Sequence, residues 1–375
     1  MPLSKIVAKS ITDDTVTADQ VSDNVFRAHK NMVINGAMEV HQRGGNVTVG
    51  DTYVVDRFPM GFVGGAVTGS HGTLSSSDSP YSEGFRKYLR LTNTTAASGS
   101  GDYRQTFQSL EGQNVATSGW DFTSSSSYVT LSFWVRVSVA GKYAFTAITN
   151  DGTPQEFAFT KTLVANTWTK VEKAIPGATN NQVDNDNGGG FTVYFRFSLG
   201  SNYTDSGRAE DTWQAYAAGT IAPDGLANWG GTTNATADLT AVQLELGDKA
   251  TPFQHTAYVD ELRRCQRYAW KLGGFGSDQY FGAPWLYHDG ATIHQGPFFN
   301  PVQMSGSPSL TQYGTPIIKD NGTAISGFTF SIQGGGKDQC FSIQGQKSSH
   351  GLANDPLNCL NSPTTSDFFI ISREV

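Results

Sequence analysis

Three segments of the chain repeat a pattern in which an aromatic residue is followed two positions later by an arginine. Sugar rings stack their C–H faces on Trp and Tyr, while sugar hydroxyls and the carboxylates of uronate or sialate accept hydrogen bonds from Arg. Residues two apart in an extended segment point to the same side. The sequence therefore predicts glycan-binding residues on outward strand faces, namely Tyr88, Arg90, Trp134, Arg136, Tyr194 and Arg196.

The same residue types have a second explanation. Arginine stems and aromatic rings also cover the solvated face of a sheet without binding a ligand. Trp, Tyr and Arg are enriched at interfaces between subunits as well. The sequence leaves these explanations open for each of the three pairs.

An Asn/Asp/Gly run at residues 183–190 contains the oxygen-bearing side chains that calcium prefers. An EF-hand loop needs an oxygen ligand at position five, glycine at six and a bidentate Glu at twelve. Counted from Asp184, position five is Gly188 and position twelve is Phe195, so the run is not an EF-hand. A looser calcium site that uses Asp184 and Asp186 stays open, with a turn that binds nothing as the alternative. No other cofactor or metal is expected.

The sequence contains no G-x-S-x-G elbow, H-E-x-x-H pair, P-loop or Cys/His metal spacing. His288 and His294 lie near Trp285 and Asp289 and could line a pocket, with a surface pair as the alternative. Glycan cleavage needs two carboxylates at a set separation, which a sequence does not show. We therefore expect a protein that is not an enzyme, with a polysaccharide depolymerase as the alternative.

The elements that would position these residues are mainly strands. Apolar and polar residues alternate clearly in the segments 87–93, 128–139 and 191–200, and Gly/Ser/Asn/Asp clusters separate the apolar segments. Short strands with such turns are typical of a sandwich or barrel. In the last 103 residues, FTFSIQG at 328–334 and CFSIQG at 340–345 predict a β-hairpin, and DFFIIS at 367–372 predicts a terminal strand.

One helix is expected, over residues 258–272. Its apolar residues recur at helical spacing, acids lie in its first turn, and basic residues follow, so its charges complement the helix dipole. Glu261 and Arg264 are spaced to form an i,i+3 ion pair that fixes the junction. This dipole-matched arrangement explains the basic residues better than contact with a nucleic acid does. Gly273 and Gly274 supply the expected helix end.

The whole composition excludes several classes of protein. The chain has 375 residues, a net charge of -7, 16% charged residues and 42 glycines. So few charges argue against a coiled-coil shaft, and the negative balance argues against a general nucleic-acid-binding surface. The chain contains no run of about 18 apolar residues, so the sequence predicts no membrane-spanning helix. The N-terminus lacks the apolar stretch of a secretory signal, and Cys265, Cys340 and Cys359 are expected to be reduced.

Several sequence blocks together resemble a known family. In chain order they are NMVINGAM at 31–38 with QRG at 42–44, YVVDRF at 53–58, QSLEGQN at 108–114, VTLSFWVR at 129–136, TWTKVEKAIPG at 167–177, VQLELGDKATPFQHTAYVDELRRCQRYAW at 242–270, and PVQM at 301–304 with Pro308. The chain is similar, over residues 31 to about 310, to bacteriophage virion proteins described as tail fibre, receptor-binding or structural proteins. The block at 242–270 is the most specific.

The resemblance implies an all-β fold. It comprises a jelly-roll β-sandwich like that of carbohydrate-binding modules, a linking helix and a second, smaller β-sandwich domain. The expected divisions are a virion-docking arm at 1–30, the jelly roll at 31–255, the helix at 256–272 and the distal domain at 273–375.

The resemblance also implies a function and partners. We expect a virion appendage protein, assembled in the host cytoplasm, that contributes to recognition of a glycan receptor on the host. Its expected partners are two further copies in a homotrimer, other virion proteins bound through residues 1–30, and host cell-surface polysaccharide. A head-surface fibre or decoration protein is the alternative structural role.

Overall fold

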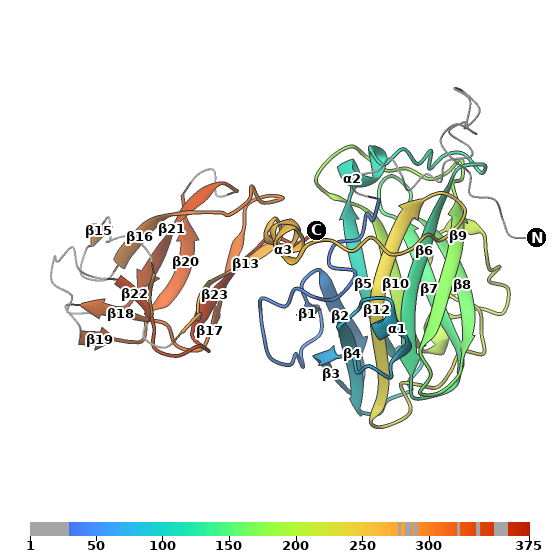
Figure 1. Cartoon of the computed structure of the whole chain (residues 1–375), viewed down its shortest axis with the longest axis horizontal. Helices are drawn as coiled ribbons and strands as arrows, with labels where there is room; N and C mark the ends of the chain where they lie inside the picture. Colours follow the sequence, from blue (N-terminus) through green and yellow to red (C-terminus); the bar gives the residue numbers. More distant parts are fainter. Residues whose placement is uncertain are drawn as a thin grey trace, which may run out of the picture.

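A computed structural model describes residues 30–276, 279–281, 287–288, 292–320, 323–334, 338–348 and 359–375. Figure 1 shows a large β body and a smaller one, with helix α3 (Tyr258–Gln266) between them. The expected arm at 1–30 lies outside the described residues except for Lys30. The fold is all-β, as the sequence predicts.

Two antiparallel sheets form the large body, which we call the sandwich. The first sheet has seven strands in the order β1-β2-β5-β10-β7-β8-β11, with bounds Thr52–Val55, Phe58–Val63, Tyr103–Glu111, Gly189–Leu199, Gly141–Thr149, Gln155–Leu163 and Trp213–Ala215. The second has five strands in the order β3-β4-β12-β6-β9, with bounds Ala66–Thr73, Lys87–Thr95, Ala235–Leu246, Tyr128–Val137 and Thr169–Pro176. The chain crosses repeatedly from one sheet to the other, which gives the expected jelly roll.

The core of the sandwich lies between the two sheets. In β6 and β10 the alternate apolar residues that the sequence assigns to one face are buried, and Phe133 and Phe195 are at most 1% exposed. The ring of Phe133 meets those of Phe145 and Phe195 from the opposite sheet, with centroids 4.8 and 4.9 Å apart. Each buried Phe contributes about 2–3 kcal/mol of hydrophobic stabilisation. The predicted alternation is confirmed, and it leaves the intervening residues on the outer faces.

Helices are few and short in the described part of the chain. Besides α3 they are α1 (Ser79–Ser82), α2 (Gly112–Ala116), η3 (Ser201–Tyr203) and η4 (Ala218–Thr220). None of the helices in the described ranges has both the length and the apolar character needed to cross a bilayer.

The linking helix is shorter than the sequence predicts. Helix α3 ends at Gln266 instead of Leu272, and β13 (Ala269–Gly273) follows almost at once. Tyr268 is 1% exposed and packs with Ile34 and Val40 of the sandwich. Beyond it, β13 pairs with the C-terminal strand β23 (Phe368–Ser372). These long-range backbone hydrogen bonds outweigh the local helical pattern, since helix propensity is a weak preference.

The smaller body has three short sheets around one core. Their orders are β13-β23-β17, β14-β22-β18-β19 and β15-β16-β21-β20. The remaining bounds are β14 Gln279–Phe281, β15 Tyr287–His288, β16 Thr292–Phe299, β17 Ser309–Tyr313, β18 Ile317–Asp320, β19 Thr323–Ile325, β20 Thr329–Gln333, β21 Cys340–Gln346 and β22 Cys359–Ser362. The β20–β21 pairing confirms the predicted hairpin, and β23 confirms the terminal strand. We call this body the distal domain.

Cys265 is buried and Cys340 is partly buried, and both are free thiols, as expected. The side chain of Cys359 lies outside the described residues, as do those of Trp285, His288 and Asp289 in the expected histidine pocket.

Candidate functional site

The three aromatic–arginine pairs lie on two opposite faces of the sandwich. Tyr88 with Arg90 and Trp134 with Arg136 lie on β4 and β6, on the outer face of the five-stranded sheet. Tyr194 and Arg196 lie on β10, on the outer face of the seven-stranded sheet. The fold therefore divides the predicted residues between two surfaces.

On the five-stranded sheet, both arginines bind carboxylates of the chain itself. Asp238 of β12 lies directly between Arg90 and Arg136, is 1% exposed, and accepts hydrogen bonds from both guanidinium groups at 2.6–2.9 Å. Arg136 also donates to Asp78 at 2.8 Å. These ion pairs occupy the groups that the sequence assigns to a sugar ligand.

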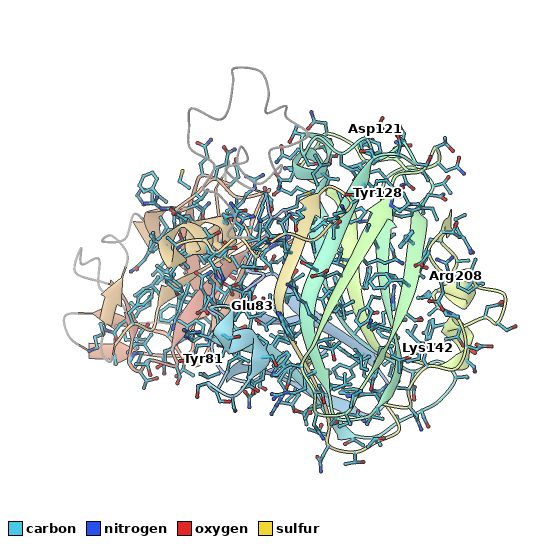
Figure 2. The ribbon with its side chains drawn as sticks, turned by 45° about the vertical axis from the view of Figure 1, so that its right-hand side comes forward. Tyr81, Glu83, Asp121, Tyr128, Lys142 and Arg208 are labelled. Atoms are coloured by element: carbon cyan, nitrogen blue, oxygen red, sulfur yellow. The ribbon has the colours of Figure 1, made fainter. Side chains whose placement is uncertain are left out.

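The aromatic rings of this face are also largely covered. Tyr88 is 9% exposed and packs edge-on against Trp168, with centroids 5.9 Å apart. The indole of Trp134 donates to Glu83 at 3.2 Å. Figure 2 shows Glu83 and Tyr81, from the α1 segment, at the side of the sandwich opposite Arg208. On this face the contacts fit the explanation in which these residues cover the sheet.

On the seven-stranded sheet, Tyr194 and Arg196 line an open cleft of about 380 Å³, which we call the tyrosine cleft. The described residues that line it are Tyr103, Gln105, Ile148, Asn150, Pro154, Tyr194, Arg196, Leu199, Tyr203, Tyr216 and Ile221. Its floor comes from strands β5, β7 and β10, while Pro154, Tyr203, Tyr216 and Ile221 form its walls. The cleft thus brings four tyrosines together, two from the sheet and two from the walls.

Strand register explains how the floor is built. Strands β5 and β10 pair so that Gln105 lies opposite Arg196 and Tyr103 opposite Leu199. The wall is fixed separately, because the Tyr203 hydroxyl donates to the Gly101 carbonyl at 3.2 Å and its ring packs edge-on against Tyr103. Tyr103 was not predicted from the sequence, because the buried side chains of β5 are mostly polar and its segment lacks the apolar alternation of β10. The loop that carries Tyr203 and Tyr216 has no periodic pattern that could reveal them.

Arg196 is buried beneath the cleft surface. It is 4% exposed and donates to Thr146, Gln105 and Glu156 at 3.1, 2.6 and 3.2 Å. Its guanidinium carbon lies 4.3 Å from the ring centroid of Tyr194. Arg196 therefore holds the ring of Tyr194 and the side-chain amide of Gln105 in place.

The tyrosines and amides offer the polar groups of the cleft. Burial raises the pKa values of Tyr103 and Tyr194, so both phenols are protonated at neutral pH. Within the described ranges, the hydroxyls of Tyr103, Tyr194 and Tyr216 form no hydrogen bond to the protein. The bond from Arg196 engages the oxygen of Gln105, which leaves its Nε2 as a donor. Apolar rings and neutral polar groups together can hold a polyol such as a sugar.

The acidic loop at 183–190 is held by protein contacts. Asp184 accepts a hydrogen bond from Gln182 at 3.1 Å, and Asp186 accepts one from the Gly188 amide at 2.9 Å. Among the described residues, no three His, Cys, Asp or Glu side chains gather closely enough to hold a metal ion. Asn187 donates to Ser305 of the distal domain, so the loop contributes to the junction. Calcium binding by Asp184 and Asp186 stays a prediction.

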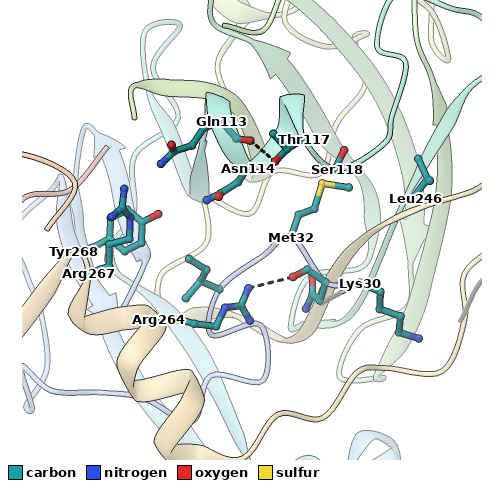
Figure 3. A pocket seen from close by; sticks show the side chains of 12 residues that line it. Lys30, Met32, Gln113, Asn114, Thr117, Ser118, Leu246, Arg264, Arg267 and Tyr268 are labelled. Carbon is teal, nitrogen blue, oxygen red and sulfur yellow. Dashed lines mark hydrogen bonds between the residues drawn. The ribbon is translucent and has the colours of Figure 1, made fainter. Parts of the chain in front are cut away.

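A larger cavity, of about 630 Å³, lies between α2, α3 and the segment that begins at Lys30 (Figure 3). Arg264 and Arg267 line it, but both are engaged. Arg264 donates to the Asn31 carbonyl at 3.1 Å and pairs with Glu261 at 3.1 Å, which confirms the predicted ion pair. Arg267 pairs with the buried Glu111 at 2.7 Å. These contacts dock α3 on the sandwich.

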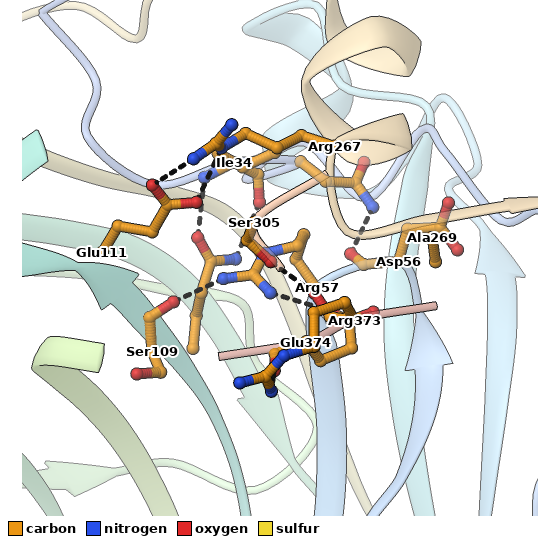
Figure 4. A network of polar contacts seen from close by, with 12 residues as sticks. Ile34, Asp56, Arg57, Ser109, Glu111, Arg267, Ala269, Ser305, Arg373 and Glu374 are labelled. Atoms are coloured by element: carbon orange, nitrogen blue, oxygen red, sulfur yellow. Dashed lines mark hydrogen bonds and ion pairs between the residues drawn. The ribbon is translucent and has the colours of Figure 1, made fainter. Parts of the chain in front are cut away.

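A polar network joins the distal domain to the sandwich (Figure 4). Glu374, near the C-terminus, pairs with Arg57 and, at 3.0 Å, with Arg43. Arg43 also meets Asp56 at 3.3 Å, and Arg57 donates to the Ser109 carbonyl. Both arginines are less than 10% exposed. The C-terminal segment is thus anchored in the sandwich by charge.

Scans against models of protein families and against curated proteins find no match. Solved structures with some likeness include a CBM4 structure at 10% identity and a TM-score of 0.28, covering 57% of this chain and 98% of that one. The CBM22-1–GH10 modules of Clostridium thermocellum endo-1,4-β-D-xylanase 10B, complexed with xylohexaose, share 10% identity at a TM-score of 0.28, covering 61% and 30%. A family 30 carbohydrate-binding module shares 12% identity at 0.27, covering 60% and 88%.

Proposed function

We propose that this chain binds carbohydrate and that the tyrosine cleft is the binding site. The observation that carries the proposal is the convergence of four tyrosine side chains with Gln105 and Asn150 in one open cleft. Its volume of about 380 Å³ lies in the usual range for small-molecule sites, about 300–1,000 Å³. The cleft is open, so a longer glycan chain could enter with only some of its units bound.

Each group has a role in this proposal. The rings of Tyr194 and Tyr216 offer apolar surface for the C–H face of a sugar, and Tyr216 is 42% exposed. The Tyr103 hydroxyl and the Gln105 amide bind sugar hydroxyls. Arg196 acts as a positioning residue, because it holds Tyr194 and Gln105 from below. No Asp or Glu is among the described residues that line the cleft, so our proposal assigns it binding and not cleavage.

The wider role that we propose is that of a phage virion appendage that contacts a host-surface glycan. The sequence blocks at 31–58 and 242–270 support it through their resemblance to tail fibre and related structural proteins. In that role residues 1–30 dock on the virion and three copies associate. Several weak glycan sites on one particle then gain through effective concentration.

Substitution in the cleft tests the proposal. We expect Tyr194→Ala to weaken binding of the purified chain to host envelope polysaccharide about tenfold, because one stacking ring is lost. Trp134→Ala, on the opposite sheet, is the matched control and should bind as the wild type does. Affinity electrophoresis with immobilised polysaccharide measures both, and thermal unfolding verifies that both variants fold. Equal binding by all three proteins would contradict the assignment of the cleft.

The wider role has its own tests. Immuno-electron microscopy of intact virions separates a tail appendage from a head fibre or decoration protein. A reducing-end assay on the same polysaccharide separates a binder, which releases no new ends, from a depolymerase. Light scattering of the purified chain gives the number of copies in the assembly.

A further inference from the structure

We infer that the tyrosine cleft selects neutral glycans and disfavours those that carry uronate or sialate carboxylates. The inference rests on the proposed function and names its ligand class. It differs from the sequence-based expectation, in which Arg196 binds sugar carboxylates. Three observations carry it: the pairing of Arg196, the chemistry of the remaining lining groups, and the charge around the cleft.

The single charged residue among the described lining residues is already neutralised. Arg196 pairs with Glu156 at 3.2 Å, and their side chains are 5% and 2% exposed. Its two other nitrogen atoms donate to Thr146 and Gln105. A sugar carboxylate would have to displace Glu156 or share its arginine. Either event leaves a buried negative charge without its own partner, which is costly.

The remaining lining groups are neutral. They are phenol hydroxyls, the side-chain amides of Gln105 and Asn150, and apolar side chains such as Ile148 and Leu199. Asn150 donates to Thr192 at 2.9 Å, so its oxygen is the group left to accept from a sugar hydroxyl. These donors and acceptors match polyol hydroxyls, which need both, and provide no full positive charge for a carboxylate.

Charged residues near the cleft do not supply the positive charge that its lining lacks. Arg208 does not line the cleft, and its guanidinium donates to the backbone carbonyls of Glu156 and Ala209 at 2.9 and 3.1 Å. Burial raises the pKa of Tyr103, and the negative charge of Asp51 raises it further. The whole chain has a net charge of -7, which repels a polyanion at long range. An acidic polysaccharide is therefore attracted neither by the charged groups near the cleft nor by the net charge of the whole chain.

The test compares polymers that differ only in charge. Polygalacturonate, hyaluronate and polysialic acid are each paired with their carboxyl-reduced forms, and neutral mannan and β-glucan extend the neutral set. Biolayer interferometry on the full chain measures binding to each polymer. We expect each polymer that binds to do so at least about tenfold more tightly in its carboxyl-reduced form.

Glu156→Gln tests the cause. Removing this carboxylate frees the charge of Arg196, so we expect affinity for the acidic polymers to rise by about threefold or more. Glu172→Gln makes the same change at an exposed position of β9, on the other sheet, and should leave every affinity unchanged.

The possible results distinguish a failure of the inferred ligand preference from a failure of the proposed glycan binding. If the acidic forms bind as tightly as the reduced forms, the inference is overturned while glycan binding stands. If the preference is present but Glu156→Gln leaves it unchanged, the ion pair is not its cause, and the inference is overturned in this form. If none of the polymers binds, the proposed function fails and the inference falls with it.

Discussion

At the residue scale, burial shifts the pKa values of two neighbouring groups in opposite senses. The His41 pKa is lowered to about 4, chiefly by burial and further by His71 and Arg43. The Asp56 pKa is raised to about 6 by burial, although Arg43 and Gln42 oppose the shift. Asp56 belongs to the network that joins the two domains, and His41 lies two residues before Arg43 of that network. Folding therefore disfavours the charged form of each.

These shifts predict opposite dependences of stability on pH. Asp56 contributes stability below about pH 4 that is lost as pH rises through 6, whereas His41 contributes stability above about pH 6.5 that is lost as pH falls through 4. In the wild type the two contributions oppose each other. In Asp56→Asn the free energy of unfolding should rise from pH 4 to 6.5, and in His41→Gln it should fall from pH 4 to 6, each by up to about 3 kcal/mol.

Urea unfolding at half-unit steps between pH 4 and 7 measures the effect. The double variant is the control and should show neither slope. Single variants whose stability follows the wild-type pH profile would contradict the assignment.

At the element scale, Asp238 joins three strands of the five-stranded sheet. It binds Arg90 of β4 on one side and Arg136 of β6 on the other. We expect Asp238→Asn to lower the free energy of unfolding by about 2–4 kcal/mol, because two guanidinium groups lose a shared buried carboxylate. The loss should stay below that of a fully buried pair, since the Arg90 side chain is 33% exposed.

The matched control is Glu172→Gln on β9 of the same sheet. Glu172 pairs with Lys170 at 3.4 Å, and both side chains are more than a third exposed, so its removal should cost less than about 1 kcal/mol. Urea unfolding at pH 7 gives both values. A similar loss in the two variants would show that the buried position of Asp238 has no special effect.

At the scale of the whole molecule, Glu374 joins the distal domain to the sandwich. Its carboxylate forms ion pairs with Arg43 and Arg57, whose side chains are 7% and 2% exposed. Removing it in Glu374→Ala leaves the buried Arg57 without a carboxylate partner among the described residues, while Arg43 keeps only Asp56. We expect a loss of about 3–5 kcal/mol at the junction and a split of the thermal unfolding curve into two transitions.

Differential scanning calorimetry resolves these transitions. Arg373→Ala is the control, because the neighbouring Arg373 is exposed and its backbone, not its side chain, bonds to Tyr268 and Ser305. Identical curves for Glu374→Ala and Arg373→Ala would contradict the anchoring role.

The sequence by itself determined several strands and their faces. The alternation in 128–139 and 191–200 has a period of two, which local backbone geometry converts directly into a buried and an outward face. The hairpin of β20 and β21 and the terminal strand could be predicted for the same reason, because a short turn and an apolar run are local signals. These features give the all-β fold.

Only the tertiary structure decided what the outward residues meet. Arg196 meets Glu156, and Tyr194 meets a cleft completed by Tyr203 and Tyr216 from an irregular loop. The end of α3 depended likewise on pairing between β13 and β23, about a hundred residues apart. Such contacts join positions distant in the chain, and their energy depends on burial and on partners that no local pattern encodes.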